Sequence, residues 1–98
     1  MSRRVIFKPQ TLGQLRWLSV REQRIVTDGI RGHLVDNDPT METRNKFRLL
    51  RTSEVADYEL RLEEVRVLYR VEAADVLITV IGRKRGNALI VEGKEYVL

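Results

Sequence analysis

The chain contains no cysteine and only 1 histidine among its 98 residues, and these scarcities exclude several kinds of protein. Without cysteine there are no disulfides, thiolate metal ligands or cysteine nucleophiles, and one imidazole cannot build a multi-histidine metal site. No apolar run approaches the roughly 18 residues of a membrane span. Residues 1–4 lead into a stretch too short and polar for a signal peptide. We therefore expect a cytoplasmic protein with no membrane segment, no metal and no cofactor.

What is present is ordinary globular composition, with 43% hydrophobic and 33% charged residues. The length suits one small domain, and no linker or repeat divides it, so we expect a single domain over residues 1–98. The charge is uneven. Residues 1–53 contain 11 Lys or Arg and 5 Asp or Glu, a net +6, whereas residues 54–98 contain 7 and 9, a net −2. The basic first part favours an anionic partner such as a nucleic acid or an acidic protein.

The first part of the sequence predicts a short strand and then two helices. Residues 4–7 form a short apolar run closed by a proline, which is typical of a strand. Thr11 and Ser19 each begin an S/T-x-x-E/Q capping box, which predicts one helix over about 11–17 and another that follows Ser19 and ends at 36–39. The apolar positions with helical spacing are Leu12, Leu15, Leu18, Ile25, Val26, Ile30 and Leu34. The two helices should form an αα-hairpin whose apolar stripe covers a sheet.

The second part of the sequence predicts strands. Residues 40–56 are charged and weakly periodic, and we expect an ordered loop there with a turn of helix. Three alternating runs, 57–62, 65–71 and 76–81, then predict an antiparallel meander. The basic stretch 82–87 should be a loop, and two short apolar runs, 88–91 and 96–98, suggest a final small hairpin. The expected class is α+β: a short N-terminal strand and an αα-hairpin on a small, mostly antiparallel sheet, with a C-terminal three-strand meander.

The meander places two arginines opposite each other. If Glu63 and Glu64 form a two-residue turn, Arg61 faces Arg66 across adjacent strands, where like charges destabilise the pair. One interpretation is a solvated face that Glu59 and the turn glutamates neutralise. The other is an anion site, because a guanidinium is always charged and can bind two phosphate oxygens at once.

A second basic signal follows the third strand, in residues 82–87. If a turn at 73–74 precedes that strand, Val65 lies opposite Gly82, and the basic stretch comes next to Arg66. Solvated loop tips often have such sequences, yet the convergence with the opposed arginines favours a functional element. Lys46, Arg48 and Arg51 stand in the charged segment 40–56, where contact with a nucleic acid and a solvated loop both remain open.

Other residue types offer little chemistry. His33 is expected to pack beside Leu34 rather than to act as a base or ligand. Trp17 and Tyr96 fit base stacking as well as core or interface packing. There is no Ser-His-Asp arrangement, phosphate loop, dinucleotide motif or paired carboxylate. Catalysis by this chain would have to use mainly arginine and lysine.

The order of strand, two helices and meander, with Y-E-L-R-L at 58–62, V-R-V-L-Y-R-V at 65–71 and V-I-G-R-K-R at 80–85, resembles the RelE/ParE toxin superfamily over most of the chain. S-V-R-E-Q at 19–23 is similar to the RelE branch. The resemblance implies the toxin of a type II toxin–antitoxin system that cleaves mRNA in the ribosomal A site. In that reaction the nucleotide's own 2′-hydroxyl attacks the neighbouring phosphate, and the protein supplies positive charge and proton transfer.

The resemblance also implies roles for residues. Arg61 matches a basic residue of the second strand, Arg66 the central arginine of the third, and Arg83 or Lys84 the basic residue after the fourth. The catalytic candidates are Arg61, Arg66 and Lys84, and the candidate nucleic-acid contacts are Arg83, Arg85, Lys46, Arg48 and Arg70. Two positions depart from RelE, because Glu59 stands in place of a lysine and Ile90 aligns near its C-terminal tyrosine.

The departures leave the general acid or base unassigned and keep two alternatives open. One is a ParE-like poison of DNA gyrase that does not cleave nucleic acid, and the other is a non-catalytic RNA-binding module. Either toxin branch implies a cognate antitoxin, whose partly disordered segment folds onto the toxin. The partners expected from the resemblance are thus the antitoxin, together with the ribosome and mRNA or else gyrase.

Overall fold

The computed structural model describes residues 3–50 and 54–97. The elements along the chain are β1 (Arg4–Phe7), α1 (Pro9–Arg16), α2 (Val20–Ile30), the π-helical turn η1 (Arg31–Val35), β2 (Lys46–Arg48), β3 (Tyr58–Leu62), β4 (Val65–Glu72), β5 (Asp75–Arg85), β6 (Ala88–Val91) and β7 (Lys94–Tyr96). The strands form one sheet in the order β2-β3-β4-β5-β6-β7, and β1 pairs with β5. Only the β1–β5 pairing is parallel over the described strands, which confirms the predicted α+β class and mostly antiparallel sheet.

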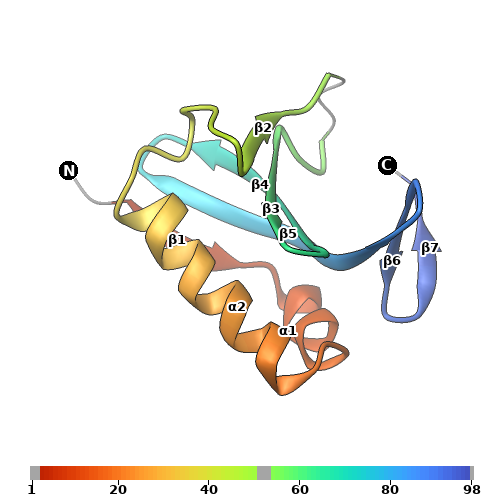
Figure 1. Ribbon diagram of the computed structural model, residues 1–98. Helices are drawn as coiled ribbons and strands as arrows, with labels where there is room; N and C mark the ends of the chain where they lie inside the picture. Colours follow the sequence, from red (N-terminus) through yellow and green to blue (C-terminus); the bar gives the residue numbers. More distant parts are fainter. Residues whose placement is uncertain (1–2, 51–53, 98) are drawn as a thin grey trace.

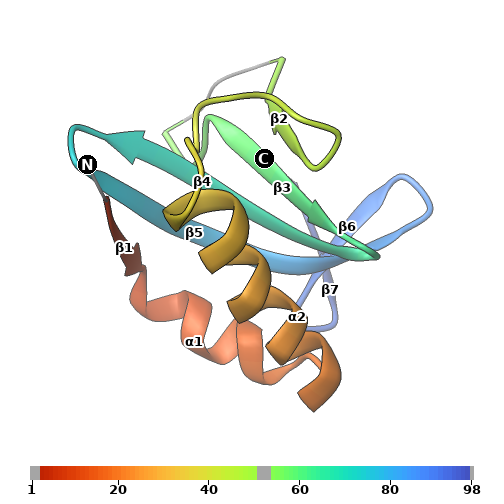
Figure 2. The same cartoon turned by 60° about the vertical axis from the view of Figure 1, so that its left-hand side comes forward.

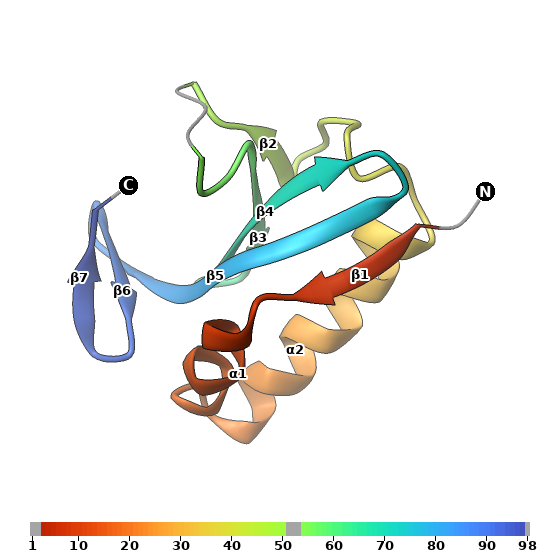
Figure 3. The ribbon, with the colours of Figure 1, turned by 180° about the vertical axis from the view of Figure 1, so that it is seen from behind.

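The helices lie together on one face of the sheet (Figure 1). Seen after a turn of the molecule, α2 crosses in front of the strands while α1 lies beside it (Figure 2). The view from behind shows β1 alongside β5, with the β6–β7 hairpin at the opposite end of the molecule (Figure 3). This final hairpin confirms the prediction for the tail, but its second strand is Lys94–Tyr96 rather than 96–98, and Leu98 lies outside the described residues. No helix in residues 3–50 and 54–97 is long and apolar enough to cross a membrane.

Both faces of the sheet are partly covered by apolar side chains. On the helix face, Val26, Ile30 and Leu34 pack with strand residues in the larger core cluster. On the other face, a smaller cluster joins Leu68 and Val80 to residues of the segment after β2 and of the final hairpin. Burial of a single valine or leucine contributes about 1.5–3 kcal/mol, so the two clusters together hold the strands between them.

The first helix begins earlier than the sequence indicated. Pro9 stands at its first turn, where a fixed φ and a missing N–H do no harm. The predicted capping box at Thr11 is wrong, because Thr11 is buried and its hydroxyl donates to the Lys8 carbonyl at 2.6 Å. The Gln14 side chain instead accepts a hydrogen bond from the backbone N–H of Ile81 at 2.8 Å. Leu12, predicted on the apolar side, is 51% exposed.

The second helix follows the sequence signal. The Ser19 hydroxyl accepts from the Glu22 N–H at 3.1 Å, and the Glu22 carboxylate accepts from the Ser19 N–H at 3.0 Å. This capping box satisfies two of the N–H groups that every helix leaves unpaired at its start. The apolar positions Val26, Ile30 and Leu34 all face the sheet, as predicted.

The segment 40–56 differs from expectation, since it contains a short strand and no helical turn over its described residues. The strand β2 pairs with β3, with Lys46 opposite Leu60. Lys46 is only 2% exposed, and its ammonium donates to the carbonyls of His33 and Asp38 at 2.9 and 2.8 Å. A buried charge requires such partners, so this lysine ties β2 to the turn that ends the helical hairpin.

The meander forms with one irregularity that the sequence did not reveal. The two-residue turns at 63–64 and 73–74 are present, with Glu63 and Ala73 in the left-handed region at φ 57° and 50°. A β-bulge shifts the β4–β5 register, because Leu68 pairs with Val80 while the next residue pairs with Ile78. Thr79 is the extra residue, and its hydroxyl donates to the Leu68 carbonyl at 3.2 Å.

The bulge changes which residues face each other at the far end of β5. The predicted pairing of Val65 with Gly82 is wrong, since Val65 faces Arg83 and Arg66 faces Gly82. The expected loop at 82–87 is also wrong, because β5 continues to Arg85 and pairs there with β6. Extended backbone makes successive side chains alternate between the two faces. The basic stretch is therefore divided between the two sides of the sheet.

Candidate functional site

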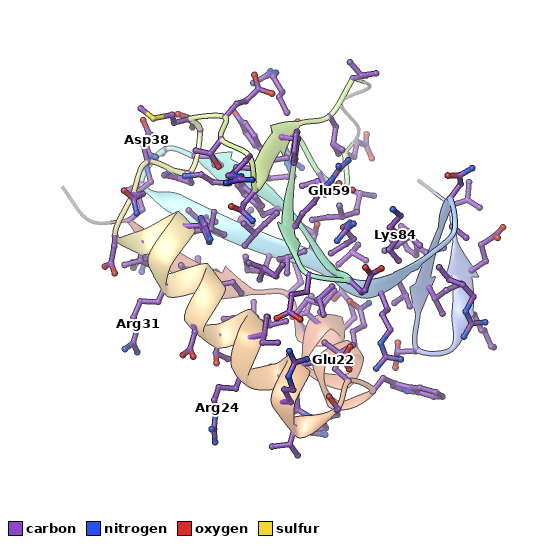
Figure 4. The ribbon with its side chains drawn as sticks, viewed as in Figure 1. Glu22, Arg24, Arg31, Asp38, Glu59 and Lys84 are labelled. Carbon is purple, nitrogen blue, oxygen red and sulfur yellow. The ribbon has the colours of Figure 1, made fainter. Side chains whose placement is uncertain are left out.

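A cavity of about 290 Å³ lies on the sheet face opposite the helices, at the junction of β3, β4, β5 and β6. It is lined by Glu59, Arg61, Arg66, Lys84, Gly86, Asn87, Ala88 and Leu89. We call it the cation pocket, because three of these side chains are basic and one is acidic. Figure 4 shows Glu59 and Lys84 together on this side of the sheet, with Arg24 and Arg31 projecting from the opposite side of the molecule. The structure thus brings all three catalytic candidates into one cavity.

Arg61 and Arg66 face each other across β3 and β4, in the register that the sequence predicted. Such opposed like charges require compensation. The Arg61 Nε donates to Glu59 at 2.6 Å, and its guanidinium lies over the Phe47 ring at 4.2 Å from the centroid. Phe47 and Glu59 are themselves paired across β2 and β3. These contacts hold Arg61 in one orientation, and the Glu59 carboxylate partly neutralises the opposed arginine pair.

Arg66 is held differently, by backbone rather than by a carboxylate. Its Nη1 donates to the carbonyls of Glu63 and Val65 at 2.7 and 3.0 Å. Because carbonyls are neutral, they position the guanidinium without cancelling its charge. Arg66 therefore contributes an oriented positive charge to the cation pocket.

Lys84 enters the pocket because of the bulge in β5. Beyond the bulge, Gly82 shares the face of its partner Arg66, and Lys84 two residues later shares it too. The Lys84 backbone N–H donates to the Glu64 carbonyl at 2.7 Å, which holds this end of β5 against the β3–β4 turn. Within the described part of the chain, no ion pair engages the Lys84 ammonium. Its charge is available to an anion in the cavity.

Arg83 and Arg85 project to the other face and do not line the cation pocket. The Arg83 Nε and Nη2 donate to the two Glu22 oxygens at 3.0 and 2.5 Å. The Arg83 hydrogen bonds are the main cause that lowers the pKa of Glu22 from 4.5 to about 2. Arg83 thus joins β5 to the start of α2, which is a structural role in the folded chain.

The remaining predicted contacts lie away from the cavity. Lys46 does not line the cation pocket, because it is buried and its ammonium donates to two backbone carbonyls. Arg51 lies outside the described residues. Arg48 donates to the Tyr58 hydroxyl at 2.9 Å and lies over that ring. Arg70 donates to the Glu54 carbonyl at 2.7 Å and pairs with Glu72 at 3.4 Å. Neither arginine lines the cation pocket.

Two further residues bear on acid–base chemistry. His33 is half-buried, and burial, reinforced by the nearby Lys46 charge, lowers its pKa. It belongs to the helical hairpin and does not line the cation pocket. Tyr96 packs into the smaller apolar cluster. Glu59 is therefore the one carboxylate among the described residues that line the pocket, and no described histidine or tyrosine lines it.

Gly86 and Asn87 belong to the stretch 82–87 that the sequence favoured as a functional element, whereas Ala88 and Leu89 in the same wall were not identified from the sequence as part of a site. The only sequence signal near Ala88 and Leu89 was the Gly-Asn turn between two strand-like runs, which is typical of a tight hairpin. Gly86 adopts φ 60°, which suits glycine at that turn. No group of three or more histidine or acidic side chains that could hold a metal ion occurs in residues 3–50 and 54–97.

The cavity has the charge and size to bind a phosphate group. Two guanidiniums and one ammonium converge on it from three different strands, so their relative positions depend on backbone hydrogen bonds rather than on loop geometry. Fixed cations of this kind can bind a phosphodiester and stabilise the additional negative charge of a pentacoordinate transition state.

The comparisons with known proteins identify the fold through solved structures. No family model matches the sequence, and no curated protein matches it significantly. The structure is similar to a chain of the toxin–antitoxin complex RelBE2 from Mycobacterium tuberculosis, with a TM-score of 0.71 and 22% identity, covering 86% of this chain and 100% of that one. It is also similar to a chain of the archaeal RelE–RelB complex from Pyrococcus horikoshii, with a TM-score of 0.68 and 25% identity, covering 90% of this chain and 100% of that one.

Proposed function

We propose that this chain is the toxin of a type II toxin–antitoxin system and that the cation pocket cleaves RNA. The single observation that supports this proposal best is the convergence of Arg61, Arg66 and Lys84 in one cavity of a RelE-like fold. The fold alone would not select a chemistry, because one fold can host several functions. The positive charge of the pocket favours phosphodiester chemistry among the functions that this fold could host.

The proposed reaction uses the RNA's own 2′-hydroxyl as nucleophile. A bond forms between O2′ and the adjacent phosphorus, and the bond from phosphorus to O5′ breaks, which leaves a 2′,3′-cyclic phosphate and a 5′-hydroxyl. The proton lost from O2′ and the proton gained by O5′ balance each other. Arg61, Arg66 and Lys84 stabilise the extra charge on the phosphoryl oxygens as it develops. No co-reactant is required.

Glu59 has a defined place in this proposal. Its carboxylate accepts a hydrogen bond from the Nε of Arg61 at 2.6 Å, so an incoming phosphate has to share or replace that hydrogen bond. It is also the only carboxylate of the described pocket lining that could accept the O2′ proton. The two effects oppose each other, because the negative charge that would accept a proton also weakens the attraction of the pocket for phosphate.

The proposed target is mRNA in the ribosome, and the proposed partner that restrains the toxin is a cognate antitoxin. Support comes from the two similar structures, which are RelE–RelB or toxin–antitoxin complexes. The decisive assay is translation in vitro with the purified chain, in which primer extension maps the mRNA 5′ ends with and without ribosomes. We expect cuts within codons only when ribosomes are present. Cuts without ribosomes would contradict ribosome dependence, and intact mRNA would contradict cleavage.

The Glu59–Arg61 pair and the lack of a tyrosine in the described pocket lining favour one second candidate, a gyrase poison that cleaves no nucleic acid itself. In that case the purified chain should trap gyrase–DNA cleavage complexes in a supercoiling reaction while leaving translated mRNA intact. Absence of trapped complexes at stoichiometric amounts of the chain would exclude this alternative.

A further inference from the structure

A second cavity lies on the helix side of β5, between the end of α1 and the β6–β7 hairpin. We call it the Trp17 groove; its volume is about 190 Å³. It is lined by Gln14, Trp17, Leu18, Ile81, Gly82, Arg83, Arg85, Ile90, Glu92 and Gly93. Leu18 and Ile81 are buried, at 6% and 0% exposure, and give the groove an apolar floor. The charged residues Arg83, Arg85 and Glu92 line the same groove.

Trp17 is an exposed aromatic side chain that the structure holds at the edge of this groove. It is 60% exposed, although it is the largest apolar residue type in the chain. A Cβ added to Gly93 would come within 3.0 Å of its ring, so the indole packs directly on the backbone of the β6–β7 turn. Gly93 has φ 80°, a conformation that glycine adopts without strain. The hairpin therefore fixes one part of the indole and leaves the rest to solvent.

Neither the mechanism proposed above nor the core uses this exposed surface. Arg83 and Arg85 face the Trp17 groove, whereas Lys84 between them faces the cation pocket on the other side of the sheet. An exposed aromatic side chain beside a cavity with an apolar floor is typical of an interaction site. Tryptophan and arginine are also the residue types that contribute most to protein–protein binding energy.

The charges around the groove indicate what would bind there. Arg83 uses two donors on Glu22, and Glu92 adds one negative charge to the lining. Arg85 is exposed, and no ion pair engages it among the residues that the structure describes. An apolar floor beside an available guanidinium matches an apolar side chain with a carboxylate next to it. The groove has room for an anchoring side chain rather than for a whole helix.

We propose that the Trp17 groove docks an acidic segment of a partner protein through one large apolar side chain. This inference rests on the proposed function, under which the partner is the antitoxin. Because the groove and the cation pocket lie on opposite faces of β5, the side chain anchored in the groove does not itself enter the pocket. The groove is thus an attachment site that is separate from any segment that blocks the pocket.

Trp17 is the only tryptophan in the chain, so its fluorescence reports on the groove alone. The experiment titrates the full chain with a tryptophan-free synthetic peptide that contains one leucine flanked by aspartates and glutamates. We expect a saturable shift of the emission to shorter wavelength, because the leucine displaces water from the indole. Inorganic phosphate, which should occupy the cation pocket, is expected to leave this titration unchanged.

Two variants sharpen the test. Arg85→Glu should weaken peptide binding by at least about tenfold, because it reverses the charge beside the anchor. Arg24→Glu is the matched control, since Arg24 is an exposed arginine of α2 that does not line the groove and should leave binding unchanged. An equal loss in both variants would show general charge attraction only and would overturn the proposal. So would the absence of any emission shift with the peptide.

A uridine hexanucleotide serves as the competing probe. If it quenches Trp17 saturably while the peptide has no effect, the groove binds nucleic acid and the proposal is wrong. The experiments also test the proposed nuclease and the proposed docking site independently of each other. Arg66→Gln is expected to lose RNA cleavage yet bind the peptide normally, so unchanged cleavage in that variant counts against the nuclease alone, and failed peptide binding counts against the docking site alone.

Discussion

Replacing Arg66 by glutamine should lower RNA cleavage steeply while leaving the fold as stable as before or slightly more so. The carbonyls of Glu63 and Val65 now accept from the arginine at 2.7 and 3.0 Å, and neither contact is fully buried, so water can replace the donor that the shorter glutamine side chain withdraws. The substitution removes the positive charge. Loss of one transition-state charge donor lowers the rate by about 10²–10³, equivalent to about 2.7–4 kcal/mol.

The expected effect on stability has the opposite sign. Arg66 stands directly opposite Arg61, and a like-charged cross-strand pair destabilises a sheet by about 0.2–1 kcal/mol. Removing one charge should therefore leave the free energy of unfolding unchanged or raise it by that amount. Measuring both the cleavage rate and the free energy of unfolding separates a functional charge from a structural one. If Arg66 served only the fold, its replacement would lower the free energy of unfolding as well as the cleavage rate.

The assay compares Arg66→Gln with Arg24→Gln, a matched change at an exposed arginine of α2 on the opposite side of the molecule (Figure 4). Cleavage is followed by primer extension in a translating extract, and stability by denaturant unfolding of the same preparations. The Arg24 variant should cleave normally. Wild-type cleavage by Arg66→Gln would refute the proposed role of the pocket, and a fall in its stability of more than about 1 kcal/mol would refute the argument about opposed charges.

Three further outcomes follow from the same contacts. The Glu59→Gln variant should bind inorganic phosphate more tightly than the wild type by calorimetry, because the change frees Arg61 from a carboxylate at 2.6 Å. Equal affinity in the two proteins would refute the idea that Glu59 competes with phosphate for Arg61. Lys46→Met should lower the free energy of unfolding by about 1–3 kcal/mol, since two carbonyls lose a buried donor, and no loss would show that water replaces it. Glu22, whose pKa is lowered from 4.5 to about 2 chiefly by Arg83, stabilises the fold above its unfolded pKa, and this contribution is lost as the pH falls from about 5 to 2; unfolding curves of Glu22→Gln should lack that part of the pH dependence.

Most of the fold follows from local sequence signals. The capping box at Ser19 and Glu22, the helical spacing of Val26 and Ile30, and the alternation over 57–62 and 65–71 appear in the structure as predicted. These signals are reliable because a cap, an apolar stripe and a two-residue turn each depend on residues close together in the chain. The predictions were wrong where a residue distant in the sequence determines the local structure. Thr11 was mistaken for a cap because its neighbour in the signal, Gln14, instead binds Ile81, 67 residues away.

The prediction of a loop around Lys46 was wrong for a related reason. A lysine among other charges predicts a solvated loop, yet here its ammonium is buried between two carbonyls of the helical hairpin. No sequence pattern marks such a pair, because carbonyl acceptors belong to every residue. The strand β2 exists because β3 offers it an edge, and three residues are too few to show a period of two.

The candidate site was determined partly by the sequence and partly by the tertiary structure. The turn at 63–64 and the alternation of the strands already placed Arg61 opposite Arg66, because register in a tight hairpin is local. The choice of Lys84 rather than Arg83 as the catalytic candidate had no physical basis in the sequence. One bulged residue, Thr79, reverses the faces of every later side chain in β5, and so sends Lys84 into the pocket and Arg83 to Glu22. A bulge depends on the packing of β5 between β4 and two apolar clusters, and only the folded sheet contains that information.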